Sequence, residues 1–177
     1  MNLFLAPASR ANIDKSISTC VVLPEGSLAP SQLSKIKDAY GDNKAFHCFA
    51  MTENSRGTFK QMHPDDIVLF SIKSTGKFNY KGTVVLSIEC PKEFGDALWE
   101  FTPNDPWTLV YFLKGVTQID IKKVSLFERL DYKRGYPLPG VSCVKRNLVK
   151  GLTDRYGTLT AAVEAIERGD SPPEKPR

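Results

Sequence analysis

This sequence lacks the common signatures of enzyme chemistry. Its 177 residues include only two histidines and four cysteines, and no two cysteines form a C-x-x-C pair. No G-x-S-x-G, P-loop, G-x-G-x-x-G or H-E-x-x-H motif occurs, and the histidines do not complete a zinc-binding spacing. No nucleophile, base and orienting group can be assembled from it, so the sequence favours a binding module over an enzyme. We expect no metal and no cofactor, and any nuclease or NTPase activity should lie outside this chain.

Long apolar runs are also missing. The opening MNLFLAP is too short for a signal-peptide core and lacks a basic lead, and no apolar run approaches membrane-spanning length. We therefore expect no membrane partner and a cytoplasmic location, with buried free thiols at Cys20, Cys48, Cys90 and Cys143. The formal net charge of +4 permits a polyanionic partner without requiring one, and ordinary solubility explains it equally well.

The stretch from Asp66 to Glu89 carries the clearest structural pattern. An apolar run over 67–72 is followed by turn residues at 74–76, and from Phe78 onward apolar and polar residues alternate. Because side chains alternate only in an extended chain, this pattern predicts a hairpin at the centre of a curved sheet, with Gly82 at a bulge or close backbone approach. Asp65-Asp66 is best interpreted as a turn signal, and a nuclease metal ligand is the weaker alternative.

The remaining patterns predict strands over 2–6, 46–51, 107–113 and, weakly, 116–121. They predict helices over 10–17, 31–40, 91–99, 142–156 and 159–168, and a weak one over 124–130. Ser9 and Thr158 are expected N-caps, and Gly169 is an expected helix stop. The fold class is α+β: a twisted, partly closed β-barrel of five to six strands flanked by helices. Residues 1–169 form the expected domain, and the proline-rich segment 170–177 resembles a linker to a further domain.

Two tryptophans, Trp99 and Trp107, flank a polar loop that contains prolines. Tryptophans are more often core residues than ligand walls. An aromatic slot is nevertheless an efficient site for a flipped nucleobase, because stacking contributes about 1–3 kcal/mol per base and a methyl group adds apolar surface to bury.

Three segments resemble the YTH domain and, more broadly, the PUA-like superfamily that includes EVE domains. They are NLFLAPASRANIDKSI, VLFSIKSTGKFNYKGTV and ALWEFTPNDPWTLVYFLKGVTQIDI, and together they cover roughly residues 2–130. The resemblance implies a pocket that takes one N6-methylated adenine out of its strand by base flipping and holds it in an aromatic cage.

Carried over by position, the resemblance assigns base-binding roles to several residues. Trp99 matches a cage tryptophan, Asn12 matches the residue that reads the adenine edge, and Ser71 lies beside the pocket. The sequence departs from the family at two cage positions, which correspond here to Val22 and to a choice between Phe101 and Trp107. The cage could also be completed by Phe46 or Phe49.

The loop 52–65 and the closing segment LVKGLTDRYGTLTAAVEAI are more similar to prokaryotic relatives, the N-terminal specificity domains of McrB-like modification-dependent restriction systems. This resemblance implies modified double-stranded DNA as the partner, with a motor or nuclease beyond the C terminus. The expected phosphate contacts are Lys73, Lys77, Lys81, Lys122 and Lys123. Four alternatives stay open: a methylated or single-stranded RNA binder, a reader of modified cytosine, a nuclease, and an interaction domain that lost the pocket.

Overall fold

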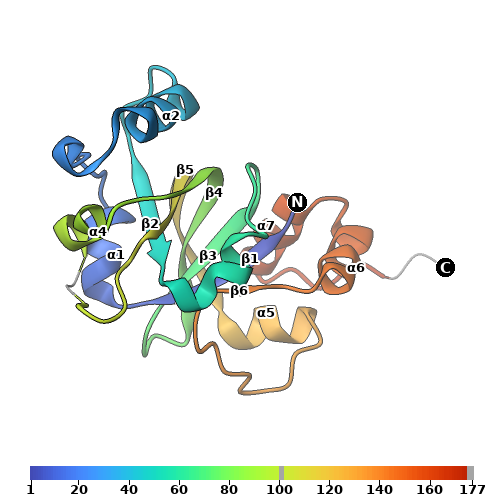
Figure 1. Cartoon of the computed structure of the whole chain (residues 1–177). Helices are drawn as coiled ribbons and strands as arrows, with labels where there is room; N and C mark the ends of the chain where they lie inside the picture. The colour runs from blue at the N-terminus through green and yellow to red at the C-terminus, as the bar shows by residue number, and fades with distance from the viewer. Residues whose placement is uncertain (100–101, 175–177) are drawn as a thin grey trace.

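A computed structural model describes residues 1–99 and 102–174 (Figure 1). Within these residues, one mixed sheet has the strand order β2-β5-β4-β3-β1-β6, in which β1 and β3 run parallel and the other neighbours antiparallel. The strands are β1 (Leu3–Ala8), β2 (His47–Met51), β3 (Ile67–Ile72), β4 (Lys77–Glu89), β5 (Leu109–Lys122) and β6 (Ser142–Cys143). The sheet curls into a half-barrel, which confirms the α+β prediction.

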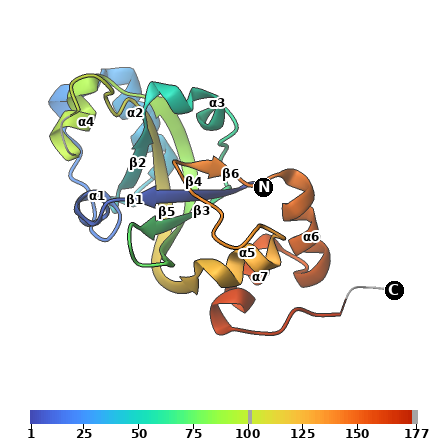
Figure 2. The same ribbon diagram turned by 90° about the horizontal axis from the view of Figure 1, so that it is seen from below.

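Helices lie on two sides of this sheet. The views in Figures 1 and 2 agree that α1, α2 and α4 gather on one side and α5, α6 and α7 on the other. The helices are α1 (Arg10–Ser16), α2 (Pro30–Tyr40), α3 (Arg56–Phe59), α4 (Lys92–Leu98), α5 (Lys123–Arg129), α6 (Arg146–Tyr156) and α7 (Leu159–Arg168). None of the helices in the described residues is long and apolar enough to cross a membrane.

The predicted helix caps are present. Ser9 Oγ accepts a hydrogen bond from the backbone N–H of Asn12 at 3.2 Å, and Thr158 Oγ1 accepts one from Ala161 at 3.0 Å. Each bond satisfies a backbone donor that has no partner inside its helix. Gly169 ends α7 in the left-handed conformation, with φ 75°. Local chemistry therefore fixes where α1 and α7 begin and where α7 ends.

The central hairpin forms as the alternation predicts, and Gly82 is a close-approach position. A Cβ at Gly82 would stand 3.2 Å from Val116 Cγ2, beside one of the register shifts between β4 and β5. Because of these bulges, the alternating apolar residues of β4 do not all face one core as the sequence predicted. Phe78, Val84 and Leu86 do not share one core but contact three different apolar clusters, because each bulge turns the strand as it coils.

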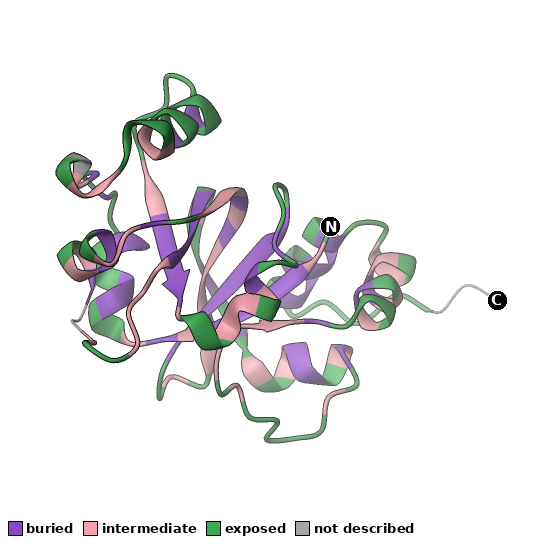
Figure 3. Ribbon diagram, in the orientation of Figure 1, coloured by how far each residue is buried: buried purple, intermediate pink, exposed green. Residues whose placement is uncertain are grey.

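The three clusters follow from strand alternation, and Figure 3 colours the buried residues of the strands and helices purple. On β1, Phe4 and Ala6 point to the inner face of the half-barrel, which holds one cluster, while Leu3 and Leu5 pack toward α5, α6 and α7. The third cluster lies between the other end of the sheet and the helices α2 and α4. The inner face and α1 thus form the part of the core nearest the cavity described below.

Three predictions need correction. The expected helix over 142–156 begins at Arg146, because Ser142 and Cys143 pair with β1 as an edge strand. The two expected strands over 107–113 and 116–121 are one strand, β5, which passes through Gly115 at φ 59°. Cys20 is exposed rather than buried, and Cys143 is half-buried.

Asp66 has a structural role at a turn. Its buried carboxylate accepts hydrogen bonds from Asn2 N at 2.6 Å, Asn2 Nδ2 at 3.1 Å and His63 N at 2.8 Å. These bonds fasten the start of β1 beside β3. In the described part of the chain, no group of three acidic, histidine or cysteine side chains could hold a metal ion. Asp66 therefore lies at a turn, as the sequence predicted, with its carboxylate engaged by these backbone and side-chain donors.

Candidate functional site

A cavity of about 330 Å³ opens where β1 runs into α1. Four other segments complete its wall: the end of β2 with the following loop, the β3–β4 turn, the segment 102–107 and the segment 139–141. The residues that carry the arguments below are Ser9, Asn12, Phe49, Lys73, Asp105, Trp107, Pro139, Gly140 and Val141. The site is therefore assembled from residues more than 130 positions apart in the sequence.

Phe49 is the centre of the aromatic cluster at this cavity. Its ring centroid lies 5.6 Å from Phe70, 5.8 Å from Trp99, 6.3 Å from Trp107 and 6.4 Å from Tyr111. The rings meet Phe49 at angles of 54–64°, so Phe70 and Trp107 pack edge to face against it and Trp99 and Tyr111 pack at a tilt. Phe49 and Trp107 line the cavity, and the remaining rings support them from behind.

Trp99 is a supporting residue and does not line the cavity. Its side chain is 4% exposed, and its Nε1–H donates to Ser16 Oγ at 2.9 Å, while Ser16 Oγ in turn donates to the backbone carbonyl of Asn12 at 3.4 Å. This chain of bonds ties the loop after α4 to α1. Trp99 therefore packs behind Phe49 and is linked to Asn12 through Ser16, and Trp107 is the tryptophan that lines the cavity.

Trp107 is held against α4 by a glycine. A Cβ at Gly95 would stand 2.4 Å from the carbonyl oxygen of Trp107 and 3.1 Å from its Cβ. Only glycine allows this approach, because no real Cβ tolerates a backbone atom so close. The Nε1–H of Trp107 is buried and has no acceptor within the residues that the structure describes.

Two polar residues from different segments line the cavity. Asn12 lies in the first turn of α1, where the Ser9 cap fixes the backbone, and it is almost fully buried. Asp105 lies in the loop between the tryptophans, where Thr102 Oγ1 donates to the Asp105 carbonyl at 2.7 Å. Sequence reasoning found Asn12 but missed Asp105. Its only sequence signal was a carboxylate between two tryptophans.

Other predicted base-binding residues lie elsewhere. Ser71 is fully buried and alternates along β3 with Phe70 and Ile72, so its side chain points to the opposite face of the sheet from the aromatic cluster. Val22 is 90% exposed and lines a separate hollow together with Phe46. Phe101 lies outside the described residues. The structure thus brings together Asn12, Phe49 and Trp107 from the predicted set.

The predicted phosphate-binding lysines lie at different distances from the cavity along the β3–β4 turn and strands β4 and β5. Lys73 lines the cavity at the β3–β4 turn. Lys122 is opposite Lys77 across the β4–β5 pair, and the backbone N–H of Lys123 donates to the Gly76 carbonyl in the same turn. Lys77 Nζ forms an ion pair with Asp120 Oδ1 at 2.9 Å. The last lysine of the predicted set, Lys81, lies further along β4 opposite Thr117.

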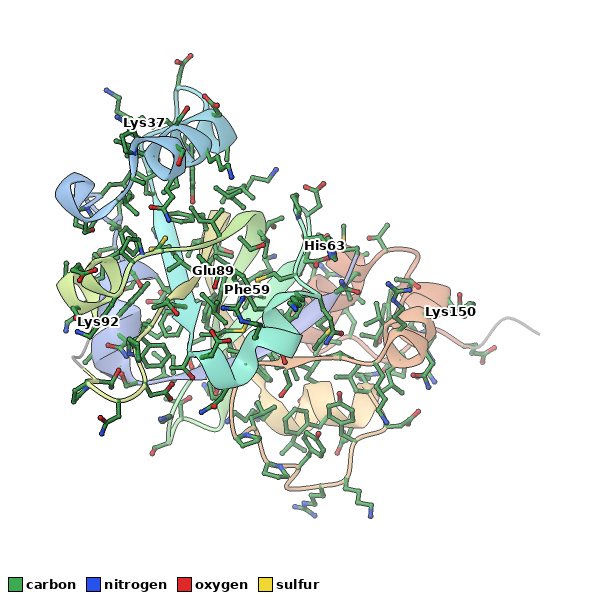
Figure 4. The ribbon with its side chains drawn as sticks, in the orientation of Figure 1. Lys37, Phe59, His63, Glu89, Lys92 and Lys150 are labelled. Carbon is green, nitrogen blue, oxygen red and sulfur yellow. The ribbon has the colours of Figure 1, made fainter. Side chains whose placement is uncertain are left out.

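Some basic side chains away from the cavity are paired within their own helices. Lys92 on α4 contacts Asp96 at 2.5 Å, and Lys150 on α6 contacts Asp154 at 2.6 Å. Figure 4 shows these two lysines on opposite sides of the molecule. Such exposed pairs contribute little to stability, and each places a negative charge beside the positive one.

Three buried ionisable groups in the apolar clusters are held in their neutral forms. Burial raises the pKa of the Tyr111 hydroxyl above its ordinary range, and burial likewise raises the pKa of the Cys48 thiol. Burial raises the pKa of Cys90 to about 12. These groups stay protonated near neutral pH, and Tyr111, which packs against Phe49, therefore adds no charge to the aromatic cluster.

The fold and cavity define a small α+β half-barrel with an aromatic and polar recess at one end. No protein-family model matches the sequence, and no curated protein matches it significantly. Among solved structures, the N-terminal domain of Thermococcus gammatolerans McrB bound to m5C DNA is similar at TM-score 0.64 and 18% identity. That match covers 87% of this chain and 96% of the other. The likeness confirms that this chain has the fold of that McrB domain.

A second solved structure was also found, at lower similarity. The YTH domain of Zygosaccharomyces rouxii MRB1 in complex with N6-methyladenosine RNA gives a TM-score of 0.41 at 14% identity, covering 84% of this chain and 80% of the other. At the level of the fold, the resemblance to McrB-like N-terminal domains is confirmed by the first of these structures.

Proposed function

We propose that this domain binds double-stranded DNA carrying a methylated base, and that the base is flipped into the cavity between Asn12, Phe49 and Trp107. N6-methyladenine is the base that we favour. The observation that carries the proposal is that aromatic walls and hydrogen-bonding side chains meet in one recess at the open end of the half-barrel. A flipped base needs this combination, because an aromatic ring stacks on its face and polar groups bond its edge.

The recess is large enough to admit a nucleobase. Ligand cavities in proteins range from about 300 to 1,000 Å³, and this one, at about 330 Å³, lies at the lower end. Stacking on an aromatic ring contributes about 1–3 kcal/mol per base, and a methyl group adds apolar surface that leaves water on binding. The gain is therefore greater for a methylated base than for the unmodified one.

The polar residues supply edge recognition. An asparagine amide offers two donors and a carbonyl acceptor, which suits the donor and acceptor pattern of an adenine edge. The Asp105 carboxylate can accept the one exocyclic N–H that N6-methyladenine retains. Lys73 at the rim, with Lys122 and Lys123 beside the same turn, would contact phosphates and make the affinity depend on salt.

Modified cytosine is the second candidate. The McrB domain that shares this fold was solved with m5C DNA. A carboxylate such as Asp105 is also a suitable acceptor for the exocyclic amine of cytosine. In either case the domain would act as the specificity module of a modification-dependent restriction system in the cytoplasm. Cleavage or translocation would then belong to another domain or subunit.

A titration panel tests the proposal. Fluorescently labelled duplexes of one sequence, carrying one N6-methyladenine, one 5-methylcytosine or no modification, are titrated with the domain, and the matching methylated RNA serves as competitor. We expect the methyladenine duplex to bind most tightly. A preference for the methylcytosine duplex would select the second candidate, and preferential competition by RNA would select an RNA reader. Equal affinity for all duplexes would refute modified-base recognition.

Variants at the cavity wall link such a preference to the site. Trp107→Ala removes the stacking surface, so affinity for the modified duplex should fall about 5- to 150-fold. Trp107→Phe keeps a ring and should retain most of the binding. Thermal melts of both variants separate lost binding from lost folding. Unchanged affinity in a folded Trp107→Ala protein would exclude this cavity as the base site.

A further inference from the structure

The loop between α5 and β6 carries an aromatic pair that the cavity does not use. Tyr132 and Tyr136 have ring centroids 4.6 Å apart at an interplanar angle of 30°. Phe127 of α5 packs against both rings, at 5.6 Å from Tyr132 and 6.1 Å from Tyr136. Tyr136 is 43% exposed, which makes it the most exposed aromatic side chain among the described residues. The two rings are therefore in contact at a tilt, and Tyr136 is partly open to solvent.

A tight turn creates this arrangement. Tyr136 N donates to the Lys133 carbonyl at 3.0 Å, and Gly135 has φ 76°, as a turn of this type requires at its third position. The turn brings the two tyrosines together and places Lys133 and Arg134, both exposed, at its tip. The backbone N–H of Tyr132 donates to the Phe127 carbonyl at 2.8 Å, so the turn is also fastened to α5.

The same loop continues into the wall of the cavity. Pro139, Gly140 and Val141 line the recess, and Pro139 follows Tyr136 by three residues. Three residues span at most about 11 Å, so the Cα atom of Tyr136 lies within that distance of the Cα atom of Pro139 in the cavity wall. Successive nucleotides of one strand rise about 3.4 Å each, so this separation corresponds to about three nucleotide steps.

We propose that residues 131–141 form a second DNA contact, in which Tyr136 stacks on a nucleotide flanking the flipped base while Lys133 and Arg134 contact the adjacent phosphates. The inference rests on the proposed function, and the occupant is the same DNA that supplies the base. Extrusion of a base leaves its neighbours without a stacking partner, and a pre-positioned ring can replace that partner. Two cations beside the ring match the phosphates in charge, and the fixed turn lowers the entropy lost on binding.

Affinity measurements on the intact chain test the stacking role. With a duplex carrying one N6-methyladenine, Tyr136→Ala should bind about 5- to 150-fold more weakly, and Tyr136→Phe should bind like the unaltered protein. Because the ring is largely exposed, both variants should fold, and thermal melts check this. Equal affinity of Tyr136→Ala and Tyr136→Phe would overturn the stacking role.

Salt titrations test the phosphate contacts. Replacing Lys133 and Arg134 together with alanine should reduce the slope of log affinity against log salt by about 2, since each phosphate contact contributes about 0.9. Lys35→Ala with Lys44→Ala is the matched control, because these exposed lysines lie at α2 and in the loop after it, on the far side of the molecule (Figure 1). Equal slopes for the two double variants would overturn the phosphate role.

Photo-crosslinking separates failure of this inference from failure of the proposed function. Duplexes with 5-iodouracil one to three nucleotides from the modified base should crosslink to peptide 131–141. Crosslinks elsewhere, with the preference for modified DNA intact, would overturn the loop contact and leave the proposed function standing. Crosslinks to this peptide without any preference for modified DNA would refute base recognition while retaining the loop as a DNA contact. If the unaltered protein binds none of the duplexes, both are wrong.

Discussion

The contact between Gly95 and Trp107 allows a sharp test of how the cavity wall is held. Gly95→Ala places a methyl group 2.4 Å from the Trp107 carbonyl oxygen, where ordinary contacts begin at 3.4 Å. The obstacle is backbone, so α4 or the Trp107 segment must move by about 1 Å. Overpacking of this kind costs about 1–3 kcal/mol. Alanine is also better than glycine inside a helix by about 1 kcal/mol, and the two effects have opposite signs.

A second glycine separates these effects. Gly151 lies inside α6, and a Cβ there meets nothing within 4 Å. Gly151→Ala should therefore show the helix preference alone and leave stability unchanged or raise it by up to about 1 kcal/mol. The difference between the two variants then isolates the packing cost, and we expect Gly95→Ala to be less stable than Gly151→Ala by about 1–3 kcal/mol.

Two measurements check this prediction. Denaturant unfolding gives the stabilities, and titration with modified duplex gives the binding. Because Gly95→Ala moves the aromatic wall, it should weaken binding under conditions where the protein is still fully folded, whereas Gly151→Ala should not. If the two variants have equal stability and both bind like the unaltered protein, the conclusion that Gly95 positions Trp107 is wrong.

Three further predictions concern the supports and chemistry of the site. Trp99→Ala should cost about 3–5 kcal/mol of stability, since this buried ring is a support rather than a ligand wall; a variant as stable as the parent in denaturant melts would contradict this. Asp105→Asn should weaken binding of a base that donates an exocyclic N–H by about 1–3 kcal/mol, and an unchanged titration would remove Asp105 from base recognition. Burial raises the pKa values of Cys48 and Cys90, so the folded protein keeps protons that unfolded thiols lose near pH 8.5. The free energy of unfolding should therefore be highest below about pH 8.5 and fall toward pH 12, and melts over a pH series that showed no fall would contradict it.

The core of the fold was predictable because its signals are local. Alternation over 78–89 requires an extended chain, Ser9 and Thr158 are capping residues, and Gly169 ends a helix in a conformation that glycine adopts freely. Each of these features depends on residues within a few positions of one another. The same reasoning failed at 142–145, because Ser142 and Cys143 become a strand only through pairing with β1 at the other end of the chain.

The aromatic site was only partly predictable. The sequence drew attention to Trp99 and Trp107 equally, since both flank one polar loop. Packing distinguishes them: Trp99 is bonded to Ser16 behind Phe49, whereas Trp107 follows the loop and reaches the cavity beside Gly95. Which of two similar residues faces a ligand depends on contacts between distant segments. Those contacts cannot be predicted from the spacing of the residues in the sequence.

The sequence by itself determined the type and order of most elements, the α+β class, and a set of residues that includes Asn12, Phe49 and Trp107. Local propensity and side-chain periodicity act over a few residues, so they can be recognised from the sequence alone. Only the tertiary structure decided that Ser71 faces away, that Val22 lines another hollow, and that Asp105 joins the cavity. Those outcomes depend on how the sheet curls and on which segments meet at its end, and close packing of the whole chain settles both.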